Sequence, residues 1–464
     1  MGVTEKIARL LTNTGYEDIP GEARDIARDA ILDCVGVTIA GSGETAVGIL
    51  AEQVKATGAA PQAGVICGGF GTSADLAAWV NGAASHVLDY DDTIALASNY
   101  NMHPTVPVLP AVLAAGESVN SSGRDIILAY VLGLEVEYRI GSAIGAYTSA
   151  LGWHPTPVLG TIGAAAACAK IFNLTVEQIR MAIGIAGSMA GGLTRNFGTM
   201  TKSLHAGNAA RNGIVAASLA RRGFTADSGL LERDYGFCHL FSAGQVKEPA
   251  ISRSGKNWEI VATGITFKPY PCCRGTHPSI DAVLYLRNKH HITADQVAGI
   301  KCKTKQQTHR ILRYDRPGNG LEAKFSMQYC VSVALLRGKV TLADFSAESL
   351  NDPAVCDIIP KISYLHPEEW EKENSLTQEV VMTLKDGREY VHRVDTPRGE
   401  PKNPMTPDEL KAKFTDCARR HFSPAWINQL LEMLTDLESL SNISNLMKLL
   451  TYGTAVPAGK TDIE

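Results

Sequence analysis

Two histidines that each precede a proline are the side chains of this sequence best suited to move protons. His103 stands before Pro104 and His154 stands before Pro155. Because the proline ring disfavours helical geometry in the preceding residue, each imidazole must lie on a fixed, non-helical turn. Imidazoles titrate near neutral pH, so such a pair can act as a base and an acid. A lone histidine is more often structural, and the residues alone leave both interpretations open.

An acidic stretch precedes the first of these histidines. Asp89, Asp91 and Asp92 fall within four residues, where they repel one another unless a cation or a proton relieves them. Asp89 lies between the apolar Leu88 and the aromatic Tyr90, which favours an inward-facing carboxylate. The alternative is a solvated acidic turn at the end of a helix.

Cations stand at positions where they could bind an anionic ligand. Lys202 directly precedes a predicted helix, whose first backbone N–H groups could hold a carboxylate or phosphate together with its ammonium. Lys268 lies at a predicted domain boundary, and Arg274 follows six residues later. Clefts between domains are common ligand sites, although a hinge with exposed cations would look the same. Together these residues suggest an enzyme that binds a small polycarboxylate through lysines and moves protons with histidines and an aspartate.

The elements that must position these residues are mainly helical. Ser122 with Asp125 and Thr175 with Gln178 have the spacing of capping boxes at helix starts. The run of small and apolar residues over 155–169 is shorter than a membrane span and predicts a buried helix. A helical pattern also returns late in the chain, where 425–450 is amphipathic.

The sequence pattern changes from helical to partly strand-like near residue 265. The segment 297–304 alternates like a strand, and Asp386-Gly387 lies between two strand-like segments as a hairpin turn would. We therefore predict a mainly α fold, with a large all-helical domain formed by 1–265 and 401–464. A smaller α+β domain is predicted to span 266–400 and to act as a lid.

Composition narrows the possible partners. The chain has 464 residues, a net charge of −4 and 45% hydrophobic residues, which indicates a soluble globular protein without a nucleic-acid or membrane partner. Its ten cysteines lack the spacing of a metal site and indicate a reducing, cytoplasmic location. P-loop, dinucleotide-binding, zinc-protease and EF-hand signatures are missing from the sequence. We accordingly expect no cofactor and no metal.

Four segments of the sequence, taken together, resemble the MmgE/PrpD family. They are HVLDYDDT followed by HP, GWHPTPVLGTIGAAAA, GTMTKSLHAGNAARNG and EAKFSMQY, and the resemblance extends over roughly 7–422. The family includes 2-methylcitrate dehydratase, cis-aconitate decarboxylase and iminodisuccinate epimerase. The resemblance implies a helical domain built from both ends of the chain, an α+β lid, a homodimer and a site between the two domains that needs no cofactor.

Carried over by motif, the site of that family falls on residues in each of these four segments and on Lys268. Thr93 and Tyr329 rest on the resemblance only, whereas Arg274 is proposed from the residues and not from the resemblance. The catalytic assignments are His103, His154, Asp89, Lys268 and Tyr329, and the substrate-binding assignments are Lys202, Lys268, Thr93 and Arg274.

Three functions agree with this set of residues. The first is a lyase that dehydrates or decarboxylates a citrate-like acid. The second is an epimerase of the iminodisuccinate type, for which two bases on opposite faces of a carbon are the natural arrangement. The third is a carboxylate-binding scaffold without catalysis. Cys272-Cys273-Arg274 stands where decarboxylases of the family commonly have a histidine.

Overall fold

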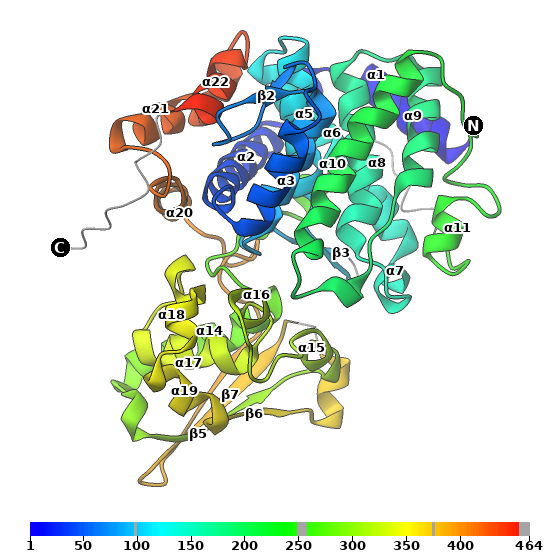
Figure 1. The fold of residues 1–464 in the computed structure, drawn as a ribbon. Helices are drawn as coiled ribbons and strands as arrows, with labels where there is room; N and C mark the ends of the chain where they lie inside the picture. Colours follow the sequence, from blue (N-terminus) through cyan, green and yellow to red (C-terminus); the bar gives the residue numbers. More distant parts are fainter. Residues whose placement is uncertain (97–99, 248–257, 374–375, 454–464) are drawn as a thin grey trace.

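The computed structural model describes residues 1–96, 100–247, 258–373 and 376–453, and it consists of a helical body and a smaller body that contains a sheet (Figure 1). Each body has its own hydrophobic core. The larger core consists mostly of buried side chains from Val3 to Phe267 and from Leu410 to Leu450. The smaller core lies between Cys272 and Val394. This is the predicted mainly α fold with a small α+β domain.

The helical domain contains most of the helices and two short antiparallel strand pairs. Its first part comprises α1 (Val3–Asn13), α2 (Gly21–Gly41), α3 (Thr45–Lys55), α4 (Ala74–His86), α5 (Thr105–Ser118), α6 (Gly123–Ile144), α7 (Tyr147–Ala150), α8 (Pro155–Ile171), α9 (Val176–Met189), α10 (Thr201–Arg221), α11 (Phe237–Phe241) and α13 (Glu259–Ala262). The strand pairs are β1 (Ala63–Gly64) with β2 (Gly71–Thr72) and β3 (Ile94–Leu96) with β4 (Tyr100–Met102). The C-terminal part comprises α20 (Pro407–Ala418), α21 (Pro424–Thr435) and α22 (Ser444–Tyr452).

Small residues allow the central helices to approach one another closely. A Cβ atom added at Gly82 of α4 would lie 2.9 Å from the Cα of Gly207 in α10, and one added at Gly213 would lie 2.4 Å from the Cβ of Ala164 in α8. Side chains at these crossings would therefore force the helices apart. The close packing brings the end of α4 and the starts of α8 and α10, which carry the predicted site residues, into one region.

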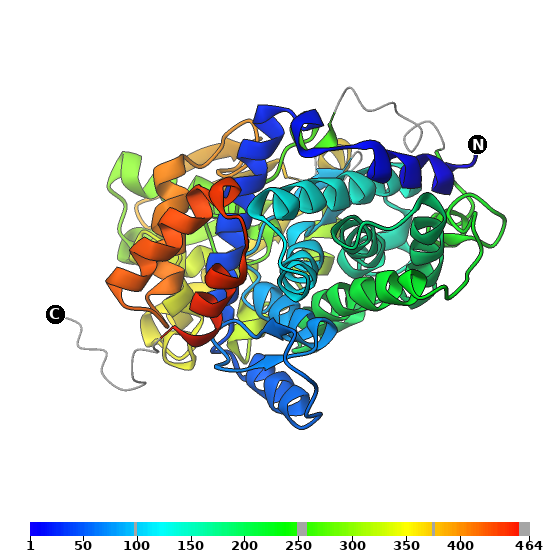
Figure 2. The ribbon, with the colours of Figure 1, turned by 90° about the horizontal axis from the view of Figure 1, so that it is seen from above.

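The C-terminal helices complete the body that the N-terminal half begins. Figure 2 shows α20 to α22 lying beside α2, and α2 contacts both α20 and α21. A Cβ at Gly36 of α2 would lie 2.9 Å from the ring of Phe414 in α20, so this contact too depends on a glycine.

The α+β domain is a four-stranded sheet with helices packed against it. The strand order is β6-β5-β7-β8, in which β5 pairs parallel with β6 and the other pairs are antiparallel. Its elements are α14 (His277–His290), β5 (Val297–Lys303), α15 (Gln306–Ile311), α16 (Gly320–Ala323), α17 (Met327–Arg337), α18 (Ala347–Leu350), α19 (Pro353–Ile358), β6 (Ile362–Leu365), β7 (Gln378–Leu384) and β8 (Glu389–Val394). The predicted hairpin joins β7 to β8, with Gly387 in the left-handed conformation at φ 87°.

Local sequence signals are confirmed where neighbouring residues alone decide the structure. Ser122 caps α6 and Thr175 caps α9 through the predicted boxes, and every residue from Pro155 to Ala169 in α8 is buried. The amphipathic stretch 425–450, in contrast, is divided between α21 and α22.

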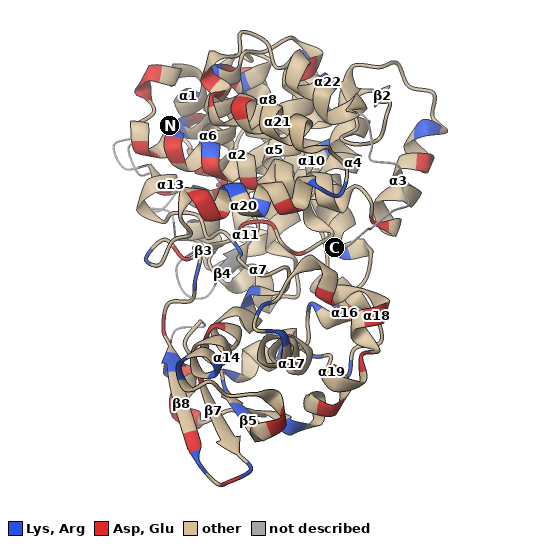
Figure 3. Cartoon of the chain, turned by 90° about the vertical axis from the view of Figure 1, so that its left-hand side faces the viewer, with Lys and Arg blue, Asp and Glu red and all other residues tan. Residues whose placement is uncertain are grey.

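Figure 3 shows acidic and basic residues interspersed over both domains. Within the described ranges, no single helix has the length and apolar character to cross a membrane. The pair α2 and α3 passes that test of composition together but is bent by 85°.

Candidate active site

A cavity of about 380 Å³ contains nearly all of the residues predicted from the sequence. One side of its lining comes from the turn after α4, the two His-Pro loops and the start of α10, and the other comes from residues 305–313 of the α+β domain. The predicted residues that line it are Asp89, Thr93, His103, His154, Lys202, Lys268 and Arg274.

The Asp89 carboxylate faces inward between two lysines. Lys202 Nζ lies 2.5 Å from Oδ1, and Lys268 Nζ lies 3.3 Å from Oδ2 while also donating to the Asp89 backbone carbonyl at 2.8 Å. Burial would raise the pKa of Asp89, but the two ammonium groups outweigh it and hold that pKa well below its usual range. Asp89 therefore stays ionised, and each lysine has a charged partner in the absence of a ligand.

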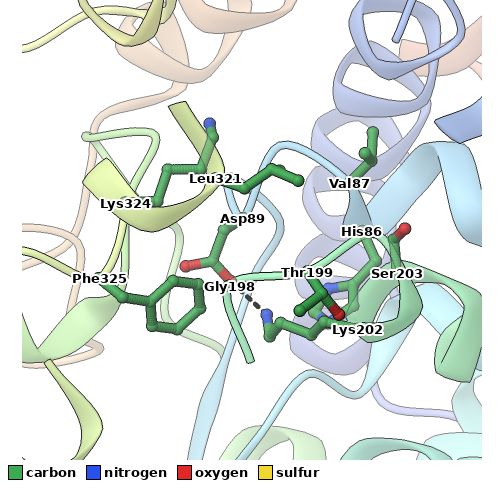
Figure 4. Close-up of a pocket in the computed structure, with 10 residues that line it drawn as sticks. All are labelled: His86, Val87, Asp89, Gly198, Thr199, Lys202, Ser203, Leu321, Lys324 and Phe325. Carbon is green, nitrogen blue, oxygen red and sulfur yellow. Dashed lines mark hydrogen bonds and ion pairs between the residues drawn. The ribbon is translucent and has the colours of Figure 1, made fainter. Parts of the chain in front are cut away.

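Figure 4 shows how both domains meet at this ion pair. Lys202 points at Asp89 from the first turn of α10, and Phe325 of the α+β domain lies beside them. Lys202 Nζ lies 5.4 Å from the ring centroids of both Phe197 and Phe325, a favourable position for a cation. The lysine is thus held by an acid from one side and by aromatic rings from both domains.

Asp91 holds His103 through one ring nitrogen. Oδ2 of Asp91 lies 2.6 Å from Nδ1 of His103 and 2.9 Å from Nδ1 of His86, whose ring packs edge-on against that of His103 at 4.6 Å. Burial lowers the pKa of His103 and lowers that of His86 to about 3, so both rings are neutral at pH 7. Burial would raise the pKa of Asp91, but the two imidazoles outweigh it and hold it well below its usual range. With the Nδ1 protons facing a carboxylate, Nε2 of His103 carries the lone pair and lies 3.9 Å from Oδ1 of Asp89 in the lining of the cavity.

His154 occupies the N-cap position of α8 and has a different partner. Its Nδ1 lies 3.1 Å from Nδ1 of His205, and its ring packs edge-on against Phe197 at 4.8 Å. Burial, followed by the nearby charge of Lys202, lowers the pKa of His154 well below its usual range and that of His205 to about 4. Because both rings are neutral, one must donate a proton to the other, and no carboxylate is in contact with this pair among the described residues.

Thr93 and Arg274 contribute a hydroxyl and a guanidinium to the lining. The backbones of Thr93 and Thr266 exchange hydrogen bonds of 2.9 and 2.8 Å, and the buried Thr93 hydroxyl has no hydrogen-bond partner among the described residues. Arg274 forms an ion pair with Glu400, which fixes its guanidinium at the cavity wall. A ligand oxygen could therefore be bound by Thr93 without breaking an existing bond.

His86, Asp91 and His103 are also the described residues whose ligand atoms come within 4.8 Å of one another, as a metal site requires. Zinc bonds of about 2.0–2.1 Å to nitrogen or oxygen place tetrahedral ligand atoms roughly 3.3 Å apart. The observed nitrogen–oxygen separations of 2.6 and 2.9 Å are shorter than this; the one to His86 is a hydrogen bond, and the one to His103 is a close contact. The cluster fits two imidazoles bound to one carboxylate better than it fits a metal centre.

Comparison with known proteins identifies the family. The family model of the MmgE/PrpD N-terminal domain matches residues 5–250, and that of the MmgE/PrpD C-terminal domain matches residues 270–438. The chain belongs to the MmgE/PrpD family. Among its relatives, the cis-aconitate decarboxylase of Mus musculus is 30% identical over 463 residues, covering 97% of this chain and 93% of that protein.

Two further MmgE/PrpD relatives carry the same name. The cis-aconitate decarboxylase of Homo sapiens is 33% identical over 385 residues, which cover 81% of this chain and 79% of that protein. The cis-aconitate decarboxylase of Aspergillus terreus (strain NIH 2624 / FGSC A1156) is 29% identical over 488 residues, covering 98% and 97%. Decarboxylases are lyases, so these similarities support a lyase.

Tyr329 is the predicted site residue of this MmgE/PrpD chain that the structure does not bring to the cavity. It lies on α17 in the core of the α+β domain, where its hydroxyl donates to the carbonyl of Asp344 and lies 3.1 Å from Oγ of Ser349. Both contacts are internal to that domain. The hydroxyl is therefore occupied by structural partners, and the catalytic assignment carried over by resemblance is not supported by its position.

The cavity has basic residues that the sequence reasoning missed. Lys305, Arg310 and Arg313 line it from the α+β domain. The available signal was the density of basic residues directly after the predicted strand 297–304. Arg313 donates to the Phe197 carbonyl at 2.7 Å and so connects this basic segment to the loop before Lys202.

Proposed function

We propose that this MmgE/PrpD chain is a lyase that decarboxylates cis-aconitate, or a closely similar small tricarboxylate, without a cofactor. One observation carries the proposal: six cationic side chains line the cavity, whereas Asp89 is the only carboxylate among its described lining residues. The cations are Lys202, Lys268, Arg274, Lys305, Arg310 and Arg313. Such an excess of positive charge suits a ligand with several carboxylates.

Decarboxylation of such a substrate develops negative charge that these cations can stabilise. When the carbon–carbon bond to one carboxylate breaks, carbon dioxide leaves and its bonding electron pair forms a new double bond. The original double bond shifts, and negative charge develops on a carbon next to a second carboxylate. We assign Lys202 and Lys268, which both line the cavity, to stabilise that charge; removing one such donor typically costs about 10²–10³-fold in rate.

The same carbon must then take up one proton. His103 is neutral and lines the cavity, so it can accept a proton from water and pass it to the carbon. While it carries that proton, the imidazolium faces Asp91 at 2.6 Å. His154 lines the same cavity and is the second candidate for the proton transfer.

The presence of two neutral imidazoles in one cavity also favours a second candidate, an epimerase that exchanges a proton on opposite faces of one carbon. Incubation in D₂O with cis-aconitate, 2-methylcitrate and an aspartate-derived dicarboxylate, followed by NMR, separates the candidates. A decarboxylase forms carbon dioxide and a product with a single new deuterium. A dehydratase gives an alkene with no loss of carbon dioxide, and an epimerase exchanges deuterium into a substrate that otherwise remains intact. Binding without turnover would refute an enzyme and indicate a scaffold.

A matched pair of variants tests the part played by His154. His154→Ala should abolish turnover while the protein stays folded by circular dichroism, because this ring touches the cavity. His239→Ala, on the surface of the same domain, should keep wild-type rates. Near wild-type turnover by His154→Ala would remove this ring from the mechanism.

We also propose that the protein is a cytoplasmic homodimer, as its composition and family suggest. Light scattering coupled to size exclusion tests the dimer, and cell fractionation tests the location.

A further inference from the structure

Three consecutive backbone carbonyls in the turn after α4 each accept a hydrogen bond from a different buried lysine. The lysines come from parts of the chain that are far apart in sequence. Leu88 accepts from Lys324 at 2.6 Å, Asp89 from Lys268 at 2.8 Å and Tyr90 from Lys413 at 2.8 Å. The turn that carries Asp89 is therefore held by the α+β domain, by the segment between the domains and by the C-terminal helix α20.

Lys324 is the member of this set that belongs to the α+β domain. It follows α16, and its ammonium donates to the carbonyls of Leu88 and Pro271 and lies 4.7 Å from the ring centroid of Phe345. Its own backbone carbonyl accepts from the N–H of Cys273 at 2.9 Å. One residue thus connects the α+β domain both to the acidic turn and to the segment between the domains.

The conformation of the turn explains why it needs such support. Asp89 has φ 52°, in the left-handed region that residues with side chains rarely adopt. Within the turn, the backbone N–H of Asp89 donates a hydrogen bond of 3.2 Å to the backbone carbonyl of His86. Unfavourable backbone conformations persist where the surrounding structure over-determines them, and the lysines on carbonyls 88 to 90 supply that constraint.

We propose that Lys324 is a positioning residue: by holding the Leu88 carbonyl, it lets the α+β domain fix the backbone that aims the Asp89 carboxylate at Lys202 and Lys268. The position of the α+β domain is thereby linked to the arrangement of Asp89, Lys202 and Lys268. Only the kinetic readout of this inference rests on the proposed decarboxylase function.

The charge of Lys324 is set by groups from both domains. Burial lowers its pKa to about 8, and Asp89, Glu44 and Cys272 raise it while Lys268 lowers it. Lys202 and His86 lie across the small pocket that Lys324 shares with Asp89. Burial would also lower the pKa of Lys268, but Asp89 and Asp91 outweigh it and raise that pKa. Lys324 can therefore lose its charge at a pH where Lys268 keeps it.

Hydrogen exchange read by mass spectrometry tests the proposal without relying on activity. Lys324→Met removes the donors and leaves an unbranched side chain one atom shorter, and Lys385→Met makes the same change at an exposed lysine of the same domain. We expect the peptide covering 87–93, which includes the Thr93 amide bound to Thr266, to exchange at least about fivefold faster in Lys324→Met only. Peptides from α6 should be unchanged in both variants.

Ligand binding supplies the second readout. The saturated tricarboxylate tricarballylate should bind about 10- to 100-fold more weakly to Lys324→Met than to Lys385→Met, as expected when a charge-assisted hydrogen bond is lost. With cis-aconitate as substrate, kcat/KM should fall by a similar factor. If the wild type does not turn over cis-aconitate, the proposed function fails, while exchange and tricarballylate binding still decide the role of Lys324.

Two results would overturn the inference. The first is exchange at 87–93 that matches Lys385→Met. The second is faster exchange throughout the α+β domain, which indicates a purely structural lysine. If Lys324→Met does not fold, the wild type is compared at pH 7 and pH 9.5 after correction for intrinsic exchange. Loss of protection confined to 87–93 supports the proposal, and equal change in all peptides refutes it.

Discussion

Replacing Asp91 with asparagine tests whether this carboxylate sets the proton affinity of His103. The carboxylate oxygen lies 2.6 Å from Nδ1 of His103; the Asp91 side chain is fully buried, and that of His103 is 13% exposed. With charge centres about 4 Å apart and an effective dielectric constant of about 20, an ionised Asp91 stabilises an imidazolium by about 4 kcal/mol. That energy corresponds to about 10³-fold in the population of protonated His103, because 1.36 kcal/mol is about tenfold.

We therefore expect Asp91→Asn to lower kcat for cis-aconitate by about 10³-fold at pH 7, measured by NMR as carbon dioxide loss. The pKa of His103 already lies below its usual value of 6.5, and removal of Asp91 lowers it further. At a pH above both pKa values, the deficit should be constant. As the pH falls towards the pKa of wild-type His103, the wild-type population saturates first and the deficit should shrink.

Asp92→Asn is the matched control for this prediction. Asp92 is the next residue and is equally buried, but burial raises its pKa well above the usual range, and the hydroxyl of Thr105 donates to its Oδ2. A neutral amide there replaces a neutral acid, so kcat should change by less than about threefold. The reasoning is refuted if Asp91→Asn loses less than about fivefold at pH 7. It is also refuted if the loss grows rather than shrinks as the pH falls.

Three other perturbations test the site and its support. Lys202→Met removes one of the two cations of Asp89 and should raise KM and lower kcat by about 10²–10³-fold; an unchanged KM would exclude contact with a substrate carboxylate. Tyr329→Phe loses the bonds to Asp344 and Ser349 and should lower the free energy of unfolding by about 1–3 kcal/mol, with kcat within twofold; a large loss of kcat without destabilisation would restore Tyr329 as a catalytic residue. Because His86 has a folded-state pKa of about 3 against 6.5 unfolded, the unfolded chain binds the extra proton as the pH falls. His86 alone should thus lower the free energy of unfolding by up to about 1.4 kcal/mol per pH unit between pH 6.5 and 4.5 in urea titrations. His86→Asn should reduce the measured slope by that amount and leave the contribution of the other buried histidines.

The parts of the fold that the sequence predicts are those decided by neighbouring residues. The capping boxes at Ser122 and Thr175 and the turn at Asp386-Gly387 depend on hydrogen bonds and backbone preferences within a few positions. The stretch 425–450 is amphipathic throughout, yet its helix is interrupted. The reason is tertiary: the Leu440 carbonyl accepts from Gly123, and the N–H of Ile443 donates to Ser121, contacts that a continuous helix could not make.

The residues of the candidate site likewise fall into two groups: those recognisable from neighbouring residues and those that depend on tertiary packing. Residues held by a proline or beside a helix start, such as His103, His154 and Lys202, have constraints that can be recognised in the sequence. Lys305, Arg310 and Arg313 join the cavity only because the α+β domain packs against the helical domain. Tyr329 is the opposite case, because its sequence motif is recognisable but the residue does not reach the cavity. The packing of α17 against 344–349 places its hydroxyl against Asp344 and Ser349 instead.

Burial alone does not decide which acids of this site carry charge. Asp91 and Asp92 are adjacent and both buried, yet the pKa of Asp91 is held low by two imidazoles while that of Asp92 is raised by burial. Glu137, also buried, has neither oxygen hydrogen-bonded among the described residues, and burial raises its pKa as well. The same physical effects apply to a substrate carboxylate in the cavity: burial favours its neutral form, so it stays ionised only where a cation lies nearby. Because Asp89 already pairs with Lys202 and Lys268, the proposed tricarboxylate substrate would share these two lysines with it. Its other charges would need the basic residues of the α+β domain, so under the proposed function that domain forms part of the binding site.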